Sequence, residues 1–230
     1  MKALVSSLIS DKIKKVLDSD VISLPPYEKL DAPVSTHPDM LFFSIGRTVF
    51  CYEDYVKEQG IDKELISAGY NIVYTDSVCH KQYPNDIALN VLQMGNFLFC
   101  KRDSMSSQIL EYSEQNDMSI INVKQGYTAC STLALDENHA ITADVGIARA
   151  IESTGKSVLL IKGDGILLDG YSCGFIGGAS FVFGDTVFFF GDITTISDGR
   201  KITDYLEQNG YKYKSIFSGR VCDFGGVKLL

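Results

Sequence analysis

The chain lacks several features that would each place it in a defined class of protein. No stretch approaches the roughly 18 continuous apolar residues of a membrane-spanning helix. No cluster of lysine or arginine is present, and the net charge is −8 with a pI of about 4.9. Because phosphate backbones are bound mainly by clustered basic side chains, we expect neither a nucleic-acid partner nor a membrane.

Paired cysteines and targeting signals are also missing. The six cysteines are scattered and form no CxxC motif, so we expect free thiols and no disulfide framework. Cys51 and Cys100 end similar strands, which indicates packed thiols. The first ten residues lack a signal-peptide cleavage pattern, and we expect a cytoplasmic protein.

What the chain has is an internal repeat of about 46 residues. Four apolar hairpins are predicted over 40–52, 87–100, 132–143 and 179–190. Their turn centres, Gly46, Gly95, Asn138 and Gly184, lie 49, 43 and 46 residues apart. Repeats of this length are typical of propellers and solenoids, in which each unit packs on its neighbours.

Each hairpin is followed by a helix and then by one more strand. The predicted helices span 53–68 (with a break at Gly60), 104–115, 144–154 and 197–208, with Ser, Asp and Gly where helix caps need them. Asp144 is interpreted as a helix N-cap, and Val145, Ile147, Ala148 and Ile151 as one core-facing stripe. The predicted third strands span 70–75, 118–123, 157–162 and 212–217.

The two ends of the chain supply a fifth unit. Strands are predicted at 226–230, 2–6 and 21–24, with a helix at 10–17. If the first strand pairs with the last, the ring closes and leaves no exposed sheet edge. We therefore predict one α/β domain over 1–230: a five-unit pseudo-symmetric propeller of β-β-α-β repeats. The repeats span 37–84, 85–128, 129–175, 176–222, and 223–230 plus 1–36; the alternative is two unrelated α/β halves.

A fivefold ring of such units resembles the pentein, or amidinotransferase-like, fold. Members of that fold include guanidine-modifying enzymes and a ribosome anti-association factor without a catalytic site. Four segments also resemble an uncharacterised bacterial family assigned to the same fold. These segments are 36–40, 123–131, 141–148 and 174–180.

The resemblance implies a catalytic site of His37, Asp39 and Cys130. His37-Pro38-Asp39 is similar to the His-x-Asp of the guanidine enzymes, and Cys130-Ser131-Thr132 is similar to their Cys-x-Ser/Thr. The 93 residues between His37 and Cys130 equal two repeats, as in those enzymes. Cys130 would be the nucleophile, His37 the general acid and base, and Asp39 a substrate anchor.

The residue types suit this chemistry. A guanidinium carbon is a poor electrophile, so a thiolate suits it better than a hydroxyl. A free cysteine has a pKa of about 8.5, and a neighbouring imidazolium or a cationic substrate would raise its thiolate fraction. A carboxylate such as Asp39 would hold the guanidinium by paired hydrogen bonds.

Each motif also has a structural interpretation. His37-Pro38-Asp39 could cap a strand through an Asx turn, and Cys130 could be an ordinary buried thiol. Gly177-Gly178 and Gly225-Gly226 recur at one repeat phase. They are candidate substrate-site residues, or they allow close backbone approach at the crowded centre. They lack the GxGxxG and GxxxxGK patterns of phosphate loops.

The sequence departs from the guanidine enzymes in its carboxylates. Gly177-Gly178 stands where those enzymes carry a further acid, and Asp223 is displaced by one residue from another acidic position. Asp223 is expected to be a weaker substrate anchor. The loss of these carboxylates leaves the substrate class open. The short loops are also more similar to those of the non-catalytic members than to those of the enzymes.

Two functions follow as hypotheses. The first is a Cys-dependent hydrolase or transferase that acts on an amidine or guanidine small molecule at the ring centre, without a cofactor. The alternative is a non-catalytic binding protein that docks a protein partner, pairs with a second copy or senses a ligand. A zinc site is a minor alternative, and its ligands would come from Cys79, His80, Cys173 and Cys222 with His37 and Cys130.

Overall fold

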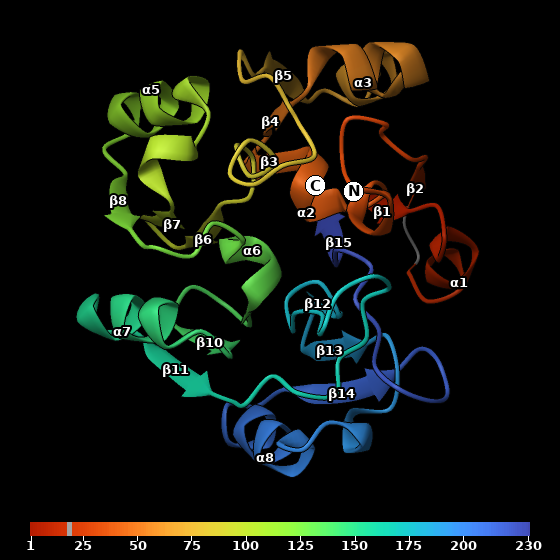
Figure 1. Ribbon diagram of the computed structural model, residues 1–230, viewed down its shortest axis with the longest axis vertical. Helices are drawn as coiled ribbons and strands as arrows, with labels where there is room; N and C mark the ends of the chain where they lie inside the picture. The colour runs from red at the N-terminus through yellow and green to blue at the C-terminus, as the bar shows by residue number, and fades with distance from the viewer. Residues whose placement is uncertain (18–19) are drawn as a thin grey trace.

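The computed structural model describes residues 1–17 and 20–230 and contains five separate three-stranded sheets. The sheets stand around a common centre, and the helices that follow the second strand of each unit lie on the outside (Figure 1). In every unit the first two strands pair antiparallel and the third pairs parallel with the second. The expected ring of five β-β-α-β units is therefore confirmed.

Four units are continuous in the sequence, and each follows the same order. The first unit comprises β3 (Phe42–Ile45), β4 (Thr48–Cys51), α3 (Glu53–Gln59), α4 (Ile61–Ser67) and β5 (Asn71–Tyr74). The second comprises β6 (Leu92–Met94), β7 (Phe97–Cys100), α5 (Ser107–Gln115) and β8 (Ser119–Asn122). The third comprises β9 (Thr132–Ala134), β10 (His139–Thr142), α7 (Val145–Ser153) and β11 (Ser157–Leu160). The fourth comprises β12 (Ser180–Phe183), β13 (Thr186–Phe189), α8 (Gly199–Gln208) and β14 (Lys212–Ser215).

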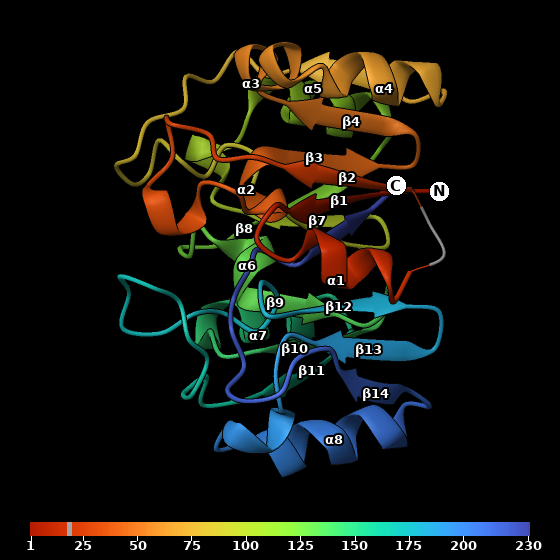
Figure 2. The ribbon, with the colours of Figure 1, turned by 90° about the vertical axis from the view of Figure 1, so that its right-hand side faces the viewer.

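The fifth unit joins the two ends of the chain. It comprises β15 (Val227–Leu229), β1 (Lys2–Ser6), α1 (Ser10–Lys14) and β2 (Asp20–Leu24). β1 pairs antiparallel with β15, with Ala3 opposite Leu229, and parallel with β2. The predicted closure is confirmed; residues 18 and 19 of this unit lie outside the described residues. Figure 2 shows the ring from the side, with α3 and α8 at opposite ends of the view.

The segments that lead into the first strands differ from the prediction. Two single-turn helices, α2 (Pro38–Leu41) and α6 (Thr128–Ser131), precede β3 and β9. The strands that were expected to start at Met40 and Ile87 start instead at Phe42 and Leu92. Pro38 favours α2 because proline suits the first helical position, where no hydrogen bond from its nitrogen is needed. Within the described residues, short 3₁₀ helices also lie at Ala32–Val34, Arg102–Ser104 and Ile193–Thr195.

Local sequence signals account for most helix boundaries. Gly60 has a φ of +69°, a left-handed conformation that ends α3 and separates it from α4 as expected. Asp144 caps α7, because its Oδ1 accepts a hydrogen bond from the backbone N–H of Ile147 at 2.8 Å. The expected apolar stripe is wrong at one position. Val145 is 48% exposed, since it lies about a third of a turn from the buried Ile151 and nearly half a turn from the buried Ile147.

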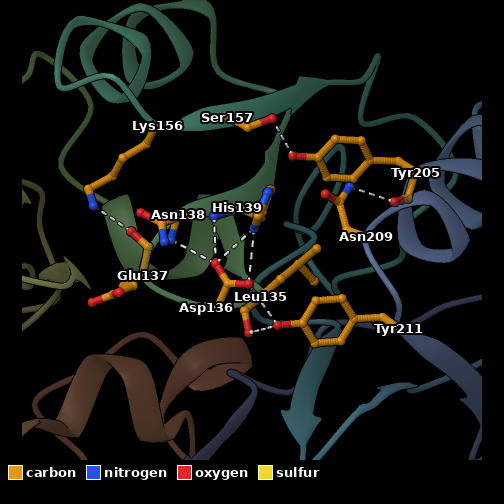
Figure 3. Close-up of polar contacts among 10 residues, drawn as sticks. All are labelled: Leu135, Asp136, Glu137, Asn138, His139, Lys156, Ser157, Tyr205, Asn209 and Tyr211. Carbon is orange, nitrogen blue, oxygen red and sulfur yellow. Dashed lines mark hydrogen bonds and ion pairs between the residues drawn. The ribbon is translucent and has the colours of Figure 1, made fainter.

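Neighbouring units are joined by polar contacts as well as by apolar packing. Asp136, in the hairpin turn of the third unit, accepts a hydrogen bond from the Tyr211 hydroxyl of the fourth unit at 2.9 Å (Figure 3). The same carboxylate accepts hydrogen bonds from the backbone of Asn138 and His139. These contacts fix the hairpin turn against the next unit.

No helix within residues 1–17 and 20–230 combines the length and the apolar character that crossing a membrane requires.

Candidate functional site

Five buried side chains meet where the units converge at the centre of the ring. His37 and Asp39 come from the α2 turn and Cys130 from α6, while Asp223 precedes β15 and Asn90 precedes β6. Each of the five is 6% exposed or less. The segments that carry them are far apart in the sequence, so only closure of the ring brings them together.

The Cys130 thiol is buried among other side chains at this centre. Its Sγ accepts a hydrogen bond from Nδ2 of Asn90 at 2.9 Å and lies 3.8 Å from the sulfur of Met40. Burial raises the pKa of Cys130 well above its ordinary value, and the charges of Asp39 and Asp223 raise it further. In the absence of a ligand, Cys130 is therefore a neutral thiol.

Asn90 holds the thiol in place and was missed by the sequence analysis. Its Nδ2 also donates to the backbone carbonyl of Asp39 at 3.0 Å, and its Oδ1 accepts from the backbone N–H of Ala129 at 2.9 Å. One amide thus ties the first, second and third units together at the hub. The signal in the sequence was a single polar residue within an apolar run, Ile87–Leu92.

His37 faces Asp223 across a short gap. Nδ1 of His37 lies 3.8 Å from Oδ1 of Asp223, which is longer than a hydrogen bond. Burial lowers the pKa of His37, and the negative charge of Asp223 only partly opposes this shift. Asp223 is held by the backbone N–H groups of Phe175 at 2.8 Å and Gly225 at 3.0 Å. Burial raises its pKa, against the charge of His37 and these two hydrogen bonds.

Asp39 is the least satisfied group at the hub. Neither oxygen of its buried carboxylate has a hydrogen-bond partner among the described residues. Burial and the charge of Asp223 raise the pKa of Asp39 to about 8. The nearby Cys130 thiol and the charge of Lys228 act in the opposite direction and lower this pKa. The thiol and the Asp39 carboxylate are close but do not form a hydrogen bond. A buried carboxyl without partners is a ready site for a cationic ligand.

Two cavities flank this hub. One, of about 190 Å³, is lined by His37, Cys130 and Asp223 and is called the thiol cavity below. The other, of about 290 Å³, runs between the first strands of the units and includes Asp39 and Lys228; it is called the axial cavity. His37, Cys130 and Asp223 therefore line the thiol cavity together. Asp39 lies close to the Cys130 thiol but lines the axial cavity.

Lys228, on β15, is a second residue that the sequence analysis did not single out. Its half-buried side chain lines the axial cavity. Burial lowers the pKa of Lys228, while the negative charges of Asp39 and Cys130 oppose this shift. Lys228 thus places an amine near Asp39 at the hub that no sequence motif marked.

The four candidate glycines lie where backbones cross closely. A Cβ atom on Gly178 would overlap the Asp223 carboxylate, and one on Gly177 would lie 2.5 Å from the carbonyl oxygen of Thr132. Gly225 has a φ of +76°, and a Cβ there would lie 2.6 Å from Cα of His37. Close approach therefore requires glycine at these positions. Gly177, Gly225 and Gly226 also line the axial cavity, and their contact with a substrate stays a prediction.

The remaining cysteines do not converge. All six are free, and Cys51 and Cys100 are buried as expected. Cys79 is buried beside the carbonyl of Lys29, whereas Cys173 is exposed. Within the part of the chain that the structure describes, no three His, Cys, Asp or Glu side chains form a metal-binding group. The zinc alternative therefore has no geometric support.

Comparison with solved structures identifies the class of fold. A dimethylarginine hydrolase (DDAH) from Pseudomonas aeruginosa, in complex with citrulline, is 12% identical with a TM-score of 0.59; the match covers 93% of this chain and 91% of that one. An amidinotransferase of the saxitoxin pathway from Microseira wollei is 11% identical with a TM-score of 0.60, over 97% and 88% of the two chains. The inosamine-phosphate amidinotransferase of Streptomyces griseus is 12% identical with a TM-score of 0.57, over 95% and 76%.

These likenesses, together with the five-unit ring, define a protein of the pentein fold. Residues 4–228 match the model of a family described as Family of unknown function (DUF6873), and the chain belongs to that family. No curated protein sequence matches it.

Proposed function

We propose that the protein is a Cys-dependent hydrolase or transferase that acts on an amidine or guanidine compound, with Cys130 as the nucleophile. The observation that carries this proposal is the meeting of Cys130, His37 and Asp223, from three different units, on one cavity. A nucleophile, a titratable base and a carboxylate on a shared cavity form the minimal set for covalent amidine chemistry.

The charge state of the site favours activation by the substrate. Burial keeps the Cys130 thiol and a large share of the Asp39 carboxyl protonated at neutral pH. An amidinium or guanidinium that binds beside them lowers both pKa values, because a nearby positive charge favours the anionic forms. The thiol then loses its proton to the neutral imidazole of His37. The thiolate therefore forms when the substrate is present.

The chemical steps balance with these residues alone. Sγ of Cys130 attacks the amidine carbon, a C–S bond forms, and the C–N bond to the leaving amine breaks as that amine takes the proton from His37. Water then attacks the same carbon while His37 accepts its proton. The C–S bond breaks, the proton returns to Cys130, and an amide or urea product leaves. If an acceptor amine replaces water, the same steps transfer the amidino group.

Asp39 and Asp223 would hold the cation during these steps. Asp223 is fixed by two backbone N–H groups and lies beside His37, so it also favours the imidazolium that forms transiently. Asp39 lies beside the thiol without a hydrogen-bond partner. A planar guanidinium can satisfy such a carboxylate with paired hydrogen bonds.

A non-catalytic binding protein is the second candidate, and one observation favours it. The thiol cavity is small and Cys130 is only 4% exposed, so a ligand would have to open the surrounding loops. In that case the hub would bind a cationic ligand without turnover, and its change of shape would be sensed by a protein partner or a second copy.

Assays of turnover separate the two candidates. We would incubate the purified protein with a panel of guanidines and amidines, with and without an acceptor amine, and measure released amine and ureido or amide product. The proposal expects turnover that disappears in Cys130→Ala while the circular dichroism and melting temperature stay close to those of wild type. Equal product formation by wild type and Cys130→Ala, or none with any member of the panel, would favour the binding protein.

A further inference from the structure

The residues that line the thiol cavity indicate what kind of group the substrate carries in addition to its amidine. Leu168, Tyr171 and Phe175 line the cavity from the long loop between β11 and β12, and Tyr127 lines it from the segment before α6. Apolar and aromatic side chains therefore form most of the wall, while the reactive groups Cys130, His37 and Asp223 lie together at the hub.

Both tyrosines present their rings to this cavity, because their hydroxyls are engaged elsewhere. The Tyr127 hydroxyl donates to Oδ2 of Asp86 at 2.6 Å, and the Tyr171 hydroxyl donates to Oδ2 of Asp31 at 2.9 Å. Neither carboxylate lines the thiol cavity. The ring of Tyr127 also lies 6.1 Å from that of Phe175, so the two form a fixed aromatic wall.

Cationic side chains are missing from this wall. Within residues 1–17 and 20–230, no lysine or arginine lines the thiol cavity, and Asp223 is its acidic member. A substrate carboxylate inside this cavity would thus lie close to Asp223 without a lysine or arginine partner, which is unfavourable. Aromatic faces, in contrast, favour a planar cation and an apolar or aromatic tail.

We infer that the substrate is an amidine or guanidine with an uncharged, apolar or aromatic tail and without a carboxylate. The observation is the combination of the buried Asp223 with an aromatic wall that, among the described residues, holds no lysine or arginine. This inference rests on the proposed function, because it assigns the tail of the compound whose amidine carbon Cys130 attacks. It excludes arginine-like amino acids as preferred substrates.

Binding to the Cys130→Ser protein tests the inference without turnover. We would measure dissociation constants by titration calorimetry for benzylguanidine, for its neutral analogue benzylurea and for arginine. Benzylguanidine is expected to bind at least about tenfold more tightly than either of the others. Tyr171→Ala should weaken the binding of benzylguanidine by roughly tenfold, since it removes one aromatic ring from the wall. Tyr171→Phe should bind like the parent protein, because it keeps the ring and loses only the bond to Asp31.

Two further variants sharpen the result. Asp169→Ala changes the same loop on the side that faces a neighbouring cavity and should leave binding unchanged. Leu168→Arg places a cation in the wall and should raise the affinity for arginine. Arginine binding as tightly as benzylguanidine, or no binding of benzylguanidine, would overturn the inference. Cys130-dependent turnover of arginine would overturn it too, while the proposed function itself would stand.

Discussion

Nδ2 of Asn90 lies 2.9 Å from Sγ of Cys130, and Oδ1 of the same amide accepts a hydrogen bond from the backbone of Ala129. The side chain of Asn90 thus contacts both the thiol and the start of the helical turn that carries it. A hydrogen bond donated to sulfur favours the thiolate over the thiol. Asn90 therefore positions the Cys130 thiol and lowers its pKa against the effect of burial.

Replacing Asn90 tests this positioning role. Asn90→Ala should lower the free energy of unfolding by about 1–3 kcal/mol, because it leaves partners in two other units without these hydrogen bonds. It should also shift the alkylation of Cys130 to higher pH. Asn96→Ala is the matched control, since its exposed amide bonds only the carbonyl of Asp117. Urea denaturation and thiol alkylation as a function of pH measure both effects; equal behaviour of the two variants would contradict the role.

Asp39 should make the protein less stable as the pH rises. The pKa of Asp39 is about 8 in the folded protein, well above that of an unfolded aspartate near 4. Between these values the folded state keeps the proton that the unfolded state has released. Unfolding therefore releases a proton, and the contribution of Asp39 to stability falls as the pH rises from about 4 to about 8.

Asp39→Asn mimics the protonated carboxyl and removes this dependence. We expect the variant to be more stable than wild type by a few kcal/mol near pH 8, with a difference that shrinks toward pH 4. The exposed Asp103→Asn serves as the control. Denaturation at several pH values gives the result, and a constant difference across this range would show that Asp39 does not titrate as described.

The Tyr211 contact should contribute to the joint between the third and fourth units. Tyr211→Phe removes the hydrogen bond to Asp136 and should lower stability by about 1 kcal/mol. Asp136 keeps its backbone donors in the variant, so no buried charge is left unpaired. Tyr213→Phe, on the exposed strand β14, is expected to have little effect. Thermal unfolding of the two variants compares them directly, and an equal loss would count against the joint.

Gly178 should be more restricted than other glycines in its unit. Gly178→Ala would force the Asp223 carboxylate to move and should lower stability by roughly 1–3 kcal/mol. It should also reduce turnover, because Asp223 lies beside His37. Gly184→Ala in the same unit meets no neighbour and carries only the strain of its positive φ, about 1 kcal/mol. Activity lost in both variants, or in neither, would contradict a specific role for Gly178.

The repeat architecture could be predicted from the sequence because its signals are local. The tight turns at Gly46 and Gly95 and the break at Gly60 depend on backbone conformation that glycine adopts readily. The helical turn that carries Cys130 was not predicted, because a helix of four residues is too short to show a 3.6-residue pattern.

The composition of the hub was only partly predictable. His37 and Cys130 stand in motifs similar to those of the guanidine enzymes and lie two repeats apart, and the structure places both on one cavity. The sequence did not identify Asn90 and Lys228 as hub residues, because each is a single polar residue in an apolar segment. The role of each depends on contacts between units. The split between the thiol and axial cavities likewise depends on packing that no single segment encodes.

The proposed function depends on activation of Cys130 by a bound amidinium. The most direct test compares alkylation by chloroacetamidine, a cation, with alkylation by neutral chloroacetamide, read out by peptide mass spectrometry. Glutathione alkylated under the same conditions serves as the reference thiol, because the exposed Cys173 itself lines the thiol cavity. We predict that the ratio of the amidine rate to the amide rate is much higher at Cys130 than for glutathione, and that His37→Ala removes this preference. The same ratio of the two rates at Cys130 and for glutathione, unchanged in His37→Ala, would contradict activation by the amidinium.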